Sequence, residues 1–185
     1  HTYFLVDFGA KSTSITFVSN HNLYFTRIIN SGSDDLTYLL AERFGLEVKE
    51  AERIKKDYGL DRRNVSVNFA LAHGIDENGN EVKVYLSDIY KTIKGFLNEH
   101  LKKILDEIKI VGKTQNMPSL HKYPLLFVGG GSSIYNFEEI IASDHTFPDK
   151  YIVKLDTLGA RDLTYAVNLG LIKAYTKYTQ DIGDE

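Results

Sequence analysis

Residues 6–14 combine the side chains that could bind a phosphate group and a metal ion. They place one carboxylate (Asp7), one glycine (Gly9) and three hydroxyls in a short turn. Because Gly9 has no side chain, backbone N–H groups and the hydroxyls of Ser12 and Thr13 could come close to a phosphate. Asp7 could hold Mg²⁺ through water, since hard cations prefer oxygen ligands. The alternative is an ordinary β-hairpin with a polar turn, because short motifs also arise by chance.

Three consecutive glycines form a second candidate site, directly after an apolar run at residues 125–128. A backbone without side chains lets a flat ring or a phosphate approach closely. A helix expected at residues 134–142 would direct the positive end of its dipole to the same place. A tight strand-to-helix turn that binds nothing is an equally good interpretation. The candidate residues are Gly129, Gly130, Gly131 and Ser132.

Glu52 and Lys55 form a third candidate site, because a spacing of three residues places both on one helix face. Together they could hydrogen-bond the hydroxyls of a sugar. Taken alone, the pair is better explained as a surface ion pair, which contributes only a few tenths of a kcal/mol, on the order of 0.3.

The composition excludes several other kinds of chemistry. The 185 residues contain no cysteine, which removes thiolate catalysis, thiolate metal sites and disulfides. The net charge of −3 does not favour a sequence-independent grip on nucleic acid. The six histidines lack the spacing of a zinc site. No apolar run approaches the roughly 20 residues of a membrane-spanning helix, and the cytoplasm is the expected compartment.

Strands and helices alternate in an order that can position these three sites. Apolar patterning and turn residues predict strands at residues 3–7, 13–18, 23–29, 65–72, 81–86, 125–128 and 151–155. Helical spacing predicts helices at residues 36–44, 49–57, 89–108, 134–142 and 162–178. Gly45 should end the first helix, the pair Asn78–Gly79 should form a hairpin turn, and Ser87 or Asp88 should cap the long helix. Residues 112–123 are expected to form a loop.

This order fits an α/β domain with a mixed sheet flanked by helices. The segment from residue 47 to residue 86, with the long helix after it, could form a small subdomain inserted into that domain. The expected division is therefore one subdomain of residues 1–46 and 111–185, and an inserted α+β subdomain of residues 47–110.

Five segments occur in the order found in the second lobe of actin-like ATPases, and they resemble the bacterial FtsA and PilM group. The first segment looks like the phosphate-2 motif, the third like the A-E-x-x-K helix and the fourth like the adenosine motif. The second and fifth resemble the strand with its G-G-x-x-L-T segment and the closing helix. In chain order they are residues 6–13, 25–37, 51–55, 128–132 and 166–171.

The resemblance implies a ribonuclease-H-like fold and roles for the candidate residues with ATP and Mg²⁺. Asp7 would act on Mg²⁺, through water, and on the hydrolytic water, which makes it the catalytic candidate. Glu52 and Lys55 would reach the ribose and the base. The residues implied at the β- and γ-phosphates are Gly9, Ser12 and Thr13. Those implied at the adenine and the α-phosphate are Gly129, Gly130, Gly131 and Ser132.

The resemblance also implies a cytoskeletal function. FtsA-type proteins polymerise and tether FtsZ to the inner face of the cell membrane during division. A PilM-like scaffold of type IV pilus assembly, a ParM-like DNA-segregating filament and the lobe of a sugar or acetate kinase remain alternatives. The sequence departs from FtsA at Ser12 and Val128, where threonine is usual.

The chain starts almost inside its first strand, so we expect it to be a piece of a longer protein. The lobe with the other phosphate loop would precede it, and the isolated piece should bind nucleotide poorly. Membrane contact should depend on a segment outside this chain, because residues 176–185 are too short and acidic to form an amphipathic anchor.

Overall fold

The structure is a computed structural model that describes residues 2–63, 69–117, 119–147 and 149–153. Its elements, in chain order, are β1 (Thr2–Phe8), β2 (Thr13–Ser19), β3 (Asn22–Ile29), α1 (Ser33–Phe44), α2 (Val48–Tyr58), β4 (Ala70–Ile75), β5 (Glu81–Tyr85), α3 (Leu86–Thr114), η1 (Leu120–Lys122), β6 (Leu125–Val128), η2 (Gly130–Ser133), α4 (Phe137–Ser143) and β7 (Lys150–Ile152). The expected helix at residues 162–178 lies outside the described residues.

Five strands form one mixed sheet in the order β3-β2-β1-β6-β7. The first three strands pair antiparallel, as the short polar turns between them predict. The pairs β1–β6 and β6–β7 are parallel. Phe4, Val6 and Phe8 alternate with less buried residues along β1, so one face of this strand lies in the core. The mixed sheet predicted from the sequence is confirmed.

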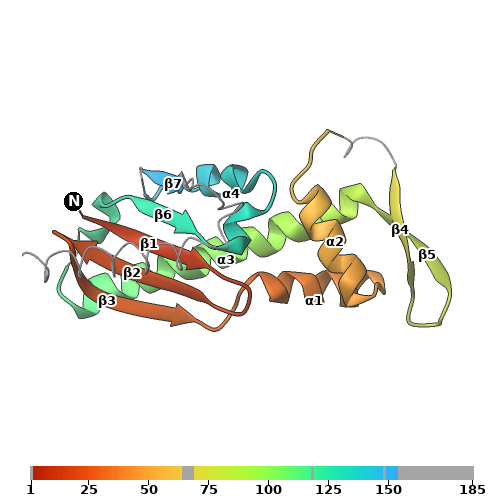
Figure 1. The fold of residues 1–185 in the computed structure, drawn as a ribbon, viewed down its shortest axis with the longest axis horizontal. Coiled ribbons are helices and arrows are strands. Elements are labelled where there is room, and N and C mark those ends of the chain that lie inside the picture. Colours follow the sequence, from red (N-terminus) through yellow and green to blue (C-terminus); the bar gives the residue numbers. More distant parts are fainter. Residues whose placement is uncertain (1, 64–68, 118, 148, 154–185) are drawn as a thin grey trace, which may run out of the picture.

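The long helix α3 packs against this sheet, where the His100 ring stacks on Phe8, and it connects the sheet to the distant hairpin (Figure 1). It begins at Leu86, with Tyr85 as its N-cap, so the prediction that Ser87 or Asp88 caps it is wrong. The helix also runs past the predicted end at residue 108 and includes Gly112. Val111 and Gly112 are buried and continue its apolar stripe, and this packing offsets the cost of roughly 1 kcal/mol for a helical glycine.

The hairpin β4–β5 lies at the far end of the molecule from the sheet (Figure 1). Its turn contains Gly79 at φ +81°, as the Asn-Gly pair predicts. The first strand runs from Ala70 to Ile75, so its predicted end at residue 72 is wrong, and residues 64–68 lie outside the described residues. The strand continues because it packs on the end of α1: the Ile75 N–H donates to the Gly45 carbonyl at 3.0 Å.

Helices α1 and α2 lie between the sheet and the hairpin (Figure 1). At the start of α1, the Gly32 N–H donates to Oδ2 of Asp35 at 3.2 Å, so the Asp35 side chain caps the first turn of the helix. Gly45 ends the helix at φ +58°, as predicted. The two helices pack on each other, with Leu36, Leu40 and Ile54 fully buried.

The segment after β6 differs from its prediction. A 3₁₀ turn directly follows Gly129, and α4 begins only at Phe137 rather than at residue 134. The helix dipole predicted at the glycine turn is therefore missing, because a 3₁₀ turn and not an α-helix follows Gly129. In the described part of the chain, no helix is long and apolar enough to cross a membrane. The division into residues 1–46 with 111–185 and residues 47–110 stays a prediction.

Candidate functional site

The turns that follow β1 and β6 lie next to each other, because these two strands are parallel neighbours. Asp7 pairs with Val128 in the register of the sheet. The carboxyl ends of parallel strands meet at one edge, which is where ligands bind in open α/β sheets. The turn after Asp7 and the glycine turn after Val128 are thus brought together although 121 residues (128 − 7) separate them in sequence.

A pocket of about 520 Å³ opens between these turns and α2. Three segments line it: the turn after β1 with the start of α1, the middle of α2, and the turn after β6. The lining residues are Asp7, Gly9, Ala10, Ser33, Asp34, Glu52, Lys55, Lys56, Gly129, Gly130, Ser133 and Ile134. The pocket therefore contains members of all three candidate sites recognised in the sequence.

Asp7 is partly buried in the pocket wall, and this burial raises the pKa of its carboxyl group. The turn after it docks onto the start of α1: the Ser33 N–H donates to the Gly9 carbonyl at 3.0 Å, and the Asp34 N–H donates to the Ala10 carbonyl at 2.8 Å. An ideal Cβ on Gly32 would lie 2.2 Å from that Ala10 carbonyl oxygen, so this close approach requires glycine.

Ser12 and Thr13 do not line the pocket. Ser12 is exposed at the turn, whereas Thr13 is fully buried. The Thr13 hydroxyl donates to the Ser31 carbonyl at 3.0 Å and lies 2.7 Å from Nε2 of His100 on α3. The Thr13 side chain is thus directed into the core, where it ties the turn to α3.

Lys55 is buried, with 5% of its side chain exposed, so the interpretation of Glu52 and Lys55 as a surface ion pair is wrong. Its Nζ lies 2.6 Å from Oε2 of Glu52 and donates to the Ser33 carbonyl at 3.0 Å and to the Thr37 hydroxyl at 2.8 Å. Burial opposes ionisation of Glu52, but hydrogen bonds from Lys55 and Thr37 outweigh it and lower the pKa of the Glu52 carboxyl. The pair therefore joins α1 to α2 at the pocket wall.

The glycine turn divides its residues between the pocket and the core. Gly129 and Gly130 line the pocket. An ideal Cβ on Gly131 would lie 2.5 Å from the ring of Phe8, so Gly131 serves core packing. Ser132 is buried and donates to the Val128 carbonyl at 2.9 Å, which stabilises the turn.

Several pocket residues were not predicted from the sequence. They are Ala10, Ser33, Asp34, Lys56, Ser133 and Ile134. Ala10, Ser133 and Ile134 lie next to the predicted turns in the sequence, so this position could have identified them as pocket residues. The pocket location of Lys56 depends on how α2 lies against the turns, which no local pattern shows.

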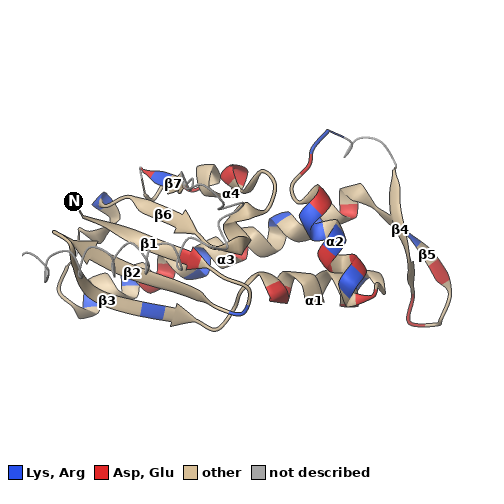
Figure 2. Ribbon diagram, in the orientation of Figure 1, with Lys and Arg blue, Asp and Glu red and all other residues tan. Residues whose placement is uncertain are grey.

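The pocket carries charges of both signs, and Figure 2 shows basic and acidic residues mixed along α2. Three carboxylates (Asp7, Asp34 and Glu52) and two ammonium groups (Lys55 and Lys56) line the pocket. Among the described residues no group of three metal-ligating side chains could hold a metal ion. The donor set nevertheless fits a metal bound together with a phosphate, because Mg²⁺ usually keeps several waters and takes one or two carboxylates plus phosphate oxygens.

Solved structures with a similar fold define the fold class of the chain. MreB5 of Spiroplasma citri bound to ADP has a TM-score of 0.72 at 17% identity, over 100% of this chain and 56% of that chain. A PilM–PilN type IV pilus biogenesis complex has a TM-score of 0.63 at 19% identity, over 92% and 45% of the two chains. Ta0583, an archaeal actin homolog, has a TM-score of 0.57 at 16% identity, over 96% and 48%. The fold is that of actin-like ATPases.

A comparison of the sequence with protein families identifies one family within the actin-like ATPases. The family described as cell division protein FtsA matches residues 4–170, and the chain belongs to that family. No curated protein sequence matches the chain. The chain spans about half the length of the solved structures to which it is similar.

Proposed function

We propose that the pocket binds ATP together with Mg²⁺. The observation that carries this proposal is the convergence of three distant segments, each with the groups that a nucleotide needs, on one pocket. The Asp7 carboxylate would hold Mg²⁺ through water and orient the hydrolytic water, and the Gly9 backbone would contact the β- and γ-phosphates. ADP in the similar MreB5 structure supports nucleotide as the ligand class.

The two remaining walls would then take the rest of the nucleotide. Glu52 and Lys55 would lie toward the ribose and the base. Gly129 and Gly130 would form the adenine and α-phosphate side, where a backbone without side chains allows close approach. Ser12, which is exposed at the turn, stays a predicted phosphate contact.

Calorimetric titration of the full-length protein with ATP tests this proposal. We expect binding that requires Mg²⁺ and is lost when EDTA is added, because the carboxylate-rich pocket would otherwise repel the phosphates. ADP should compete for the same site. A full-length protein that binds neither nucleotide in the presence of Mg²⁺ would contradict the proposal.

We further propose that the full-length protein acts in cell division as an FtsA-type filament that tethers FtsZ to the inner face of the membrane. The family match over residues 4–170 supports this role. Co-sedimentation of the full-length protein with FtsZ and anionic lipid vesicles tests it. We expect FtsZ to pellet with the vesicles only when the protein and ATP are both present.

A PilM-like scaffold of pilus assembly is the second candidate, because the PilM–PilN complex has a similar fold over most of this chain. This candidate predicts binding of a PilN peptide and no binding of FtsZ. Parallel pull-downs of the full-length protein with the two partners separate the candidates. Capture of FtsZ alone supports the division role, and capture of the PilN peptide alone contradicts it.

A further inference from the structure

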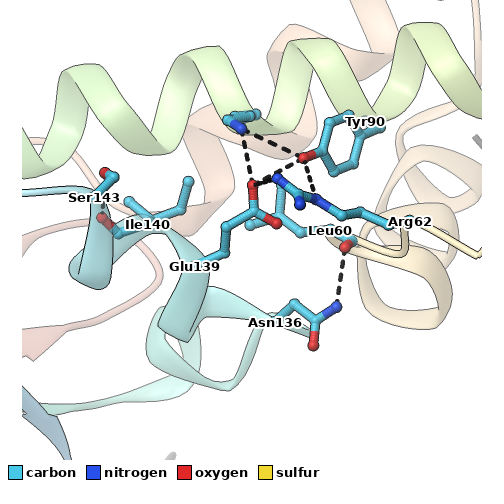
Figure 3. Close-up of polar contacts among 8 residues, drawn as sticks. Leu60, Arg62, Tyr90, Asn136, Glu139, Ile140 and Ser143 are labelled. Carbon is cyan, nitrogen blue, oxygen red and sulfur yellow. Dashed lines mark hydrogen bonds and ion pairs between the residues drawn. The ribbon is translucent and has the colours of Figure 1, made fainter.

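Glu139 on α4 accepts hydrogen bonds from two other parts of the chain. Its Oε1 lies 2.7 Å from Nη2 of Arg62, 2.8 Å from the hydroxyl of Tyr90 and 2.8 Å from Nζ of Lys94 (Figure 3). Arg62 follows α2, whereas Tyr90 and Lys94 lie on α3. Burial opposes ionisation of Glu139, but the three donors outweigh it and lower the pKa of the carboxyl group.

A second connection lies beside this carboxylate. The Leu60 N–H donates to the Tyr135 carbonyl at 3.0 Å. Nδ2 of Asn136 donates to the Leu60 carbonyl at 3.1 Å (Figure 3). Leu60 is fully buried. An ideal Cβ on Gly59 would lie 2.9 Å from the Tyr135 backbone nitrogen, so the two segments are in close contact. Backbone groups at the end of α2 are thereby fixed to the turn that precedes α4.

These contacts adjoin the pocket on both sides. Tyr135 directly follows Ile134, which lines the pocket. On the other side, the Gly59 N–H donates to the carbonyl of the pocket residue Lys55 at 3.1 Å, so Leu60 is one helical turn from the α2 wall. The contacts therefore join the ends of two pocket walls that are far apart in sequence.

We propose that these contacts form a clamp, made of Leu60, Arg62, Tyr90, Lys94, Asn136 and Glu139, that sets the spacing between the α2 wall and the glycine-turn wall. This inference rests on the proposed binding of ATP in the pocket. The clamp holds Glu52 and Lys55 at the correct distance to contact the ribose and the base. Glu139 and Asn136 do not line the pocket, so they are positioning residues.

The clamp acts at one end of the pocket only. The turn after β1 is held by α1 and by the Thr13–His100 contact, and no clamp residue takes part in these contacts. Loosening the clamp should therefore weaken contacts to the nucleoside part and the α-phosphate of ATP and leave contacts to the β- and γ-phosphates in place. A general loss of packing would weaken both.

The test compares two ligands, ATP and inorganic pyrophosphate, both with Mg²⁺, on the full-length protein; pyrophosphate stands for the β- and γ-phosphates. Glu139→Ala removes the acceptor of all three donors. Asn136→Gly removes the side-chain amide but keeps the backbone, since the φ of +60° at this position suits glycine. Glu138→Ala is the matched control, because it removes an exposed carboxylate one residue away on the same helix.

We expect Glu139→Ala and Asn136→Gly each to raise the Kd for ATP about tenfold, which corresponds to about 1.4 kcal/mol of binding free energy. Their Kd for pyrophosphate should match that of the unmodified protein, and Glu138→Ala should change neither Kd. Unchanged ATP affinity in both variants, or equal weakening for both ligands, would overturn the clamp. An unmodified protein that binds neither ligand would reject the proposed function itself and the clamp with it.

Discussion

Gly129 approaches Asp7 so closely that no other residue fits at its position. An ideal Cβ on Gly129 would lie 2.4 Å from Oδ1 of Asp7 and 2.5 Å from the carbonyl oxygen of Phe8. Gly129 also adopts a φ of +89°, which L side chains rarely reach. The two strand ends can meet at the pocket only because one of them carries a glycine.

Gly129→Ala should therefore lower the free energy of unfolding by at least about 2 kcal/mol, from backbone strain and the clash with the β1 backbone. Urea unfolding measures this loss. Gly95→Ala is the control, because Gly95 is helical with open space around it and its replacement should stabilise the protein by up to about 1 kcal/mol. Equal stability of Gly129→Ala and the unmodified protein would exclude the close approach.

Asp7→Ala should abolish ATP hydrolysis in the full-length protein and leave its fold intact. The Asp7 carboxylate is partly buried, and its raised pKa shows that burial disfavours its charge, so its removal should not destabilise the folded state. Phosphate release under saturating ATP measures the loss, and circular dichroism checks the fold. Normal turnover by this variant would remove Asp7 from the site.

Lys55→Ala should weaken ATP affinity by about 1 to 2 kcal/mol, which is the value of a charge-assisted hydrogen bond. It should also lower the free energy of unfolding by about 2 kcal/mol, since the buried ammonium group bonds the Ser33 carbonyl and the Thr37 hydroxyl. Calorimetry and urea unfolding give the two values. Lys49→Ala is the matched control, because Lys49 is exposed on the same helix and does not line the pocket. If Lys55→Ala left the ATP affinity unchanged, Lys55 would only join α1 to α2 and would not contact the nucleotide.

His100 should make stability depend on pH between about 6.5 and 4. Burial, with a smaller effect of Lys103, lowers the pKa of His100 from 6.5 to about 4. Below pH 6.5 the unfolded chain binds a proton that the folded protein does not, so the free energy of unfolding falls as the pH falls and levels off near pH 4. The total loss from this residue is about 3 kcal/mol.

The cause of this shift lies in the surroundings of the His100 ring. The ring stacks on Phe8 and Phe96, and its Nδ1 is buried with no hydrogen-bond partner among the described residues. Since the Thr13 hydroxyl donates to the Ser31 carbonyl, Nε2 of His100 must carry the proton in their shared bond. Urea unfolding at several pH values should show that His100→Phe, which keeps the stacking, removes most of this dependence. The same pH dependence in that variant would assign it to other groups.

Local patterns were sufficient to predict much of the fold. Alternation of apolar residues predicted the three-strand meander, and Gly45 and the Asn78–Gly79 pair predicted a helix end and a turn, because these features depend on neighbours in sequence. The bounds of α3 were not predictable in this way. Its extension through Gly112 depends on packing against η1, which overrides the low helix propensity of glycine.

The sequence by itself determined which residues can do chemistry here: a carboxylate and a glycine in one turn, a glycine run in another, and a charged pair on a helix. Only the tertiary structure decided which of them face the pocket. It buried the Thr13 hydroxyl against His100 and Gly131 against Phe8, and it placed Lys55 in the wall between α1 and α2. The physical reason is that side-chain direction at a turn depends on the packing of distant elements, which no local spacing contains.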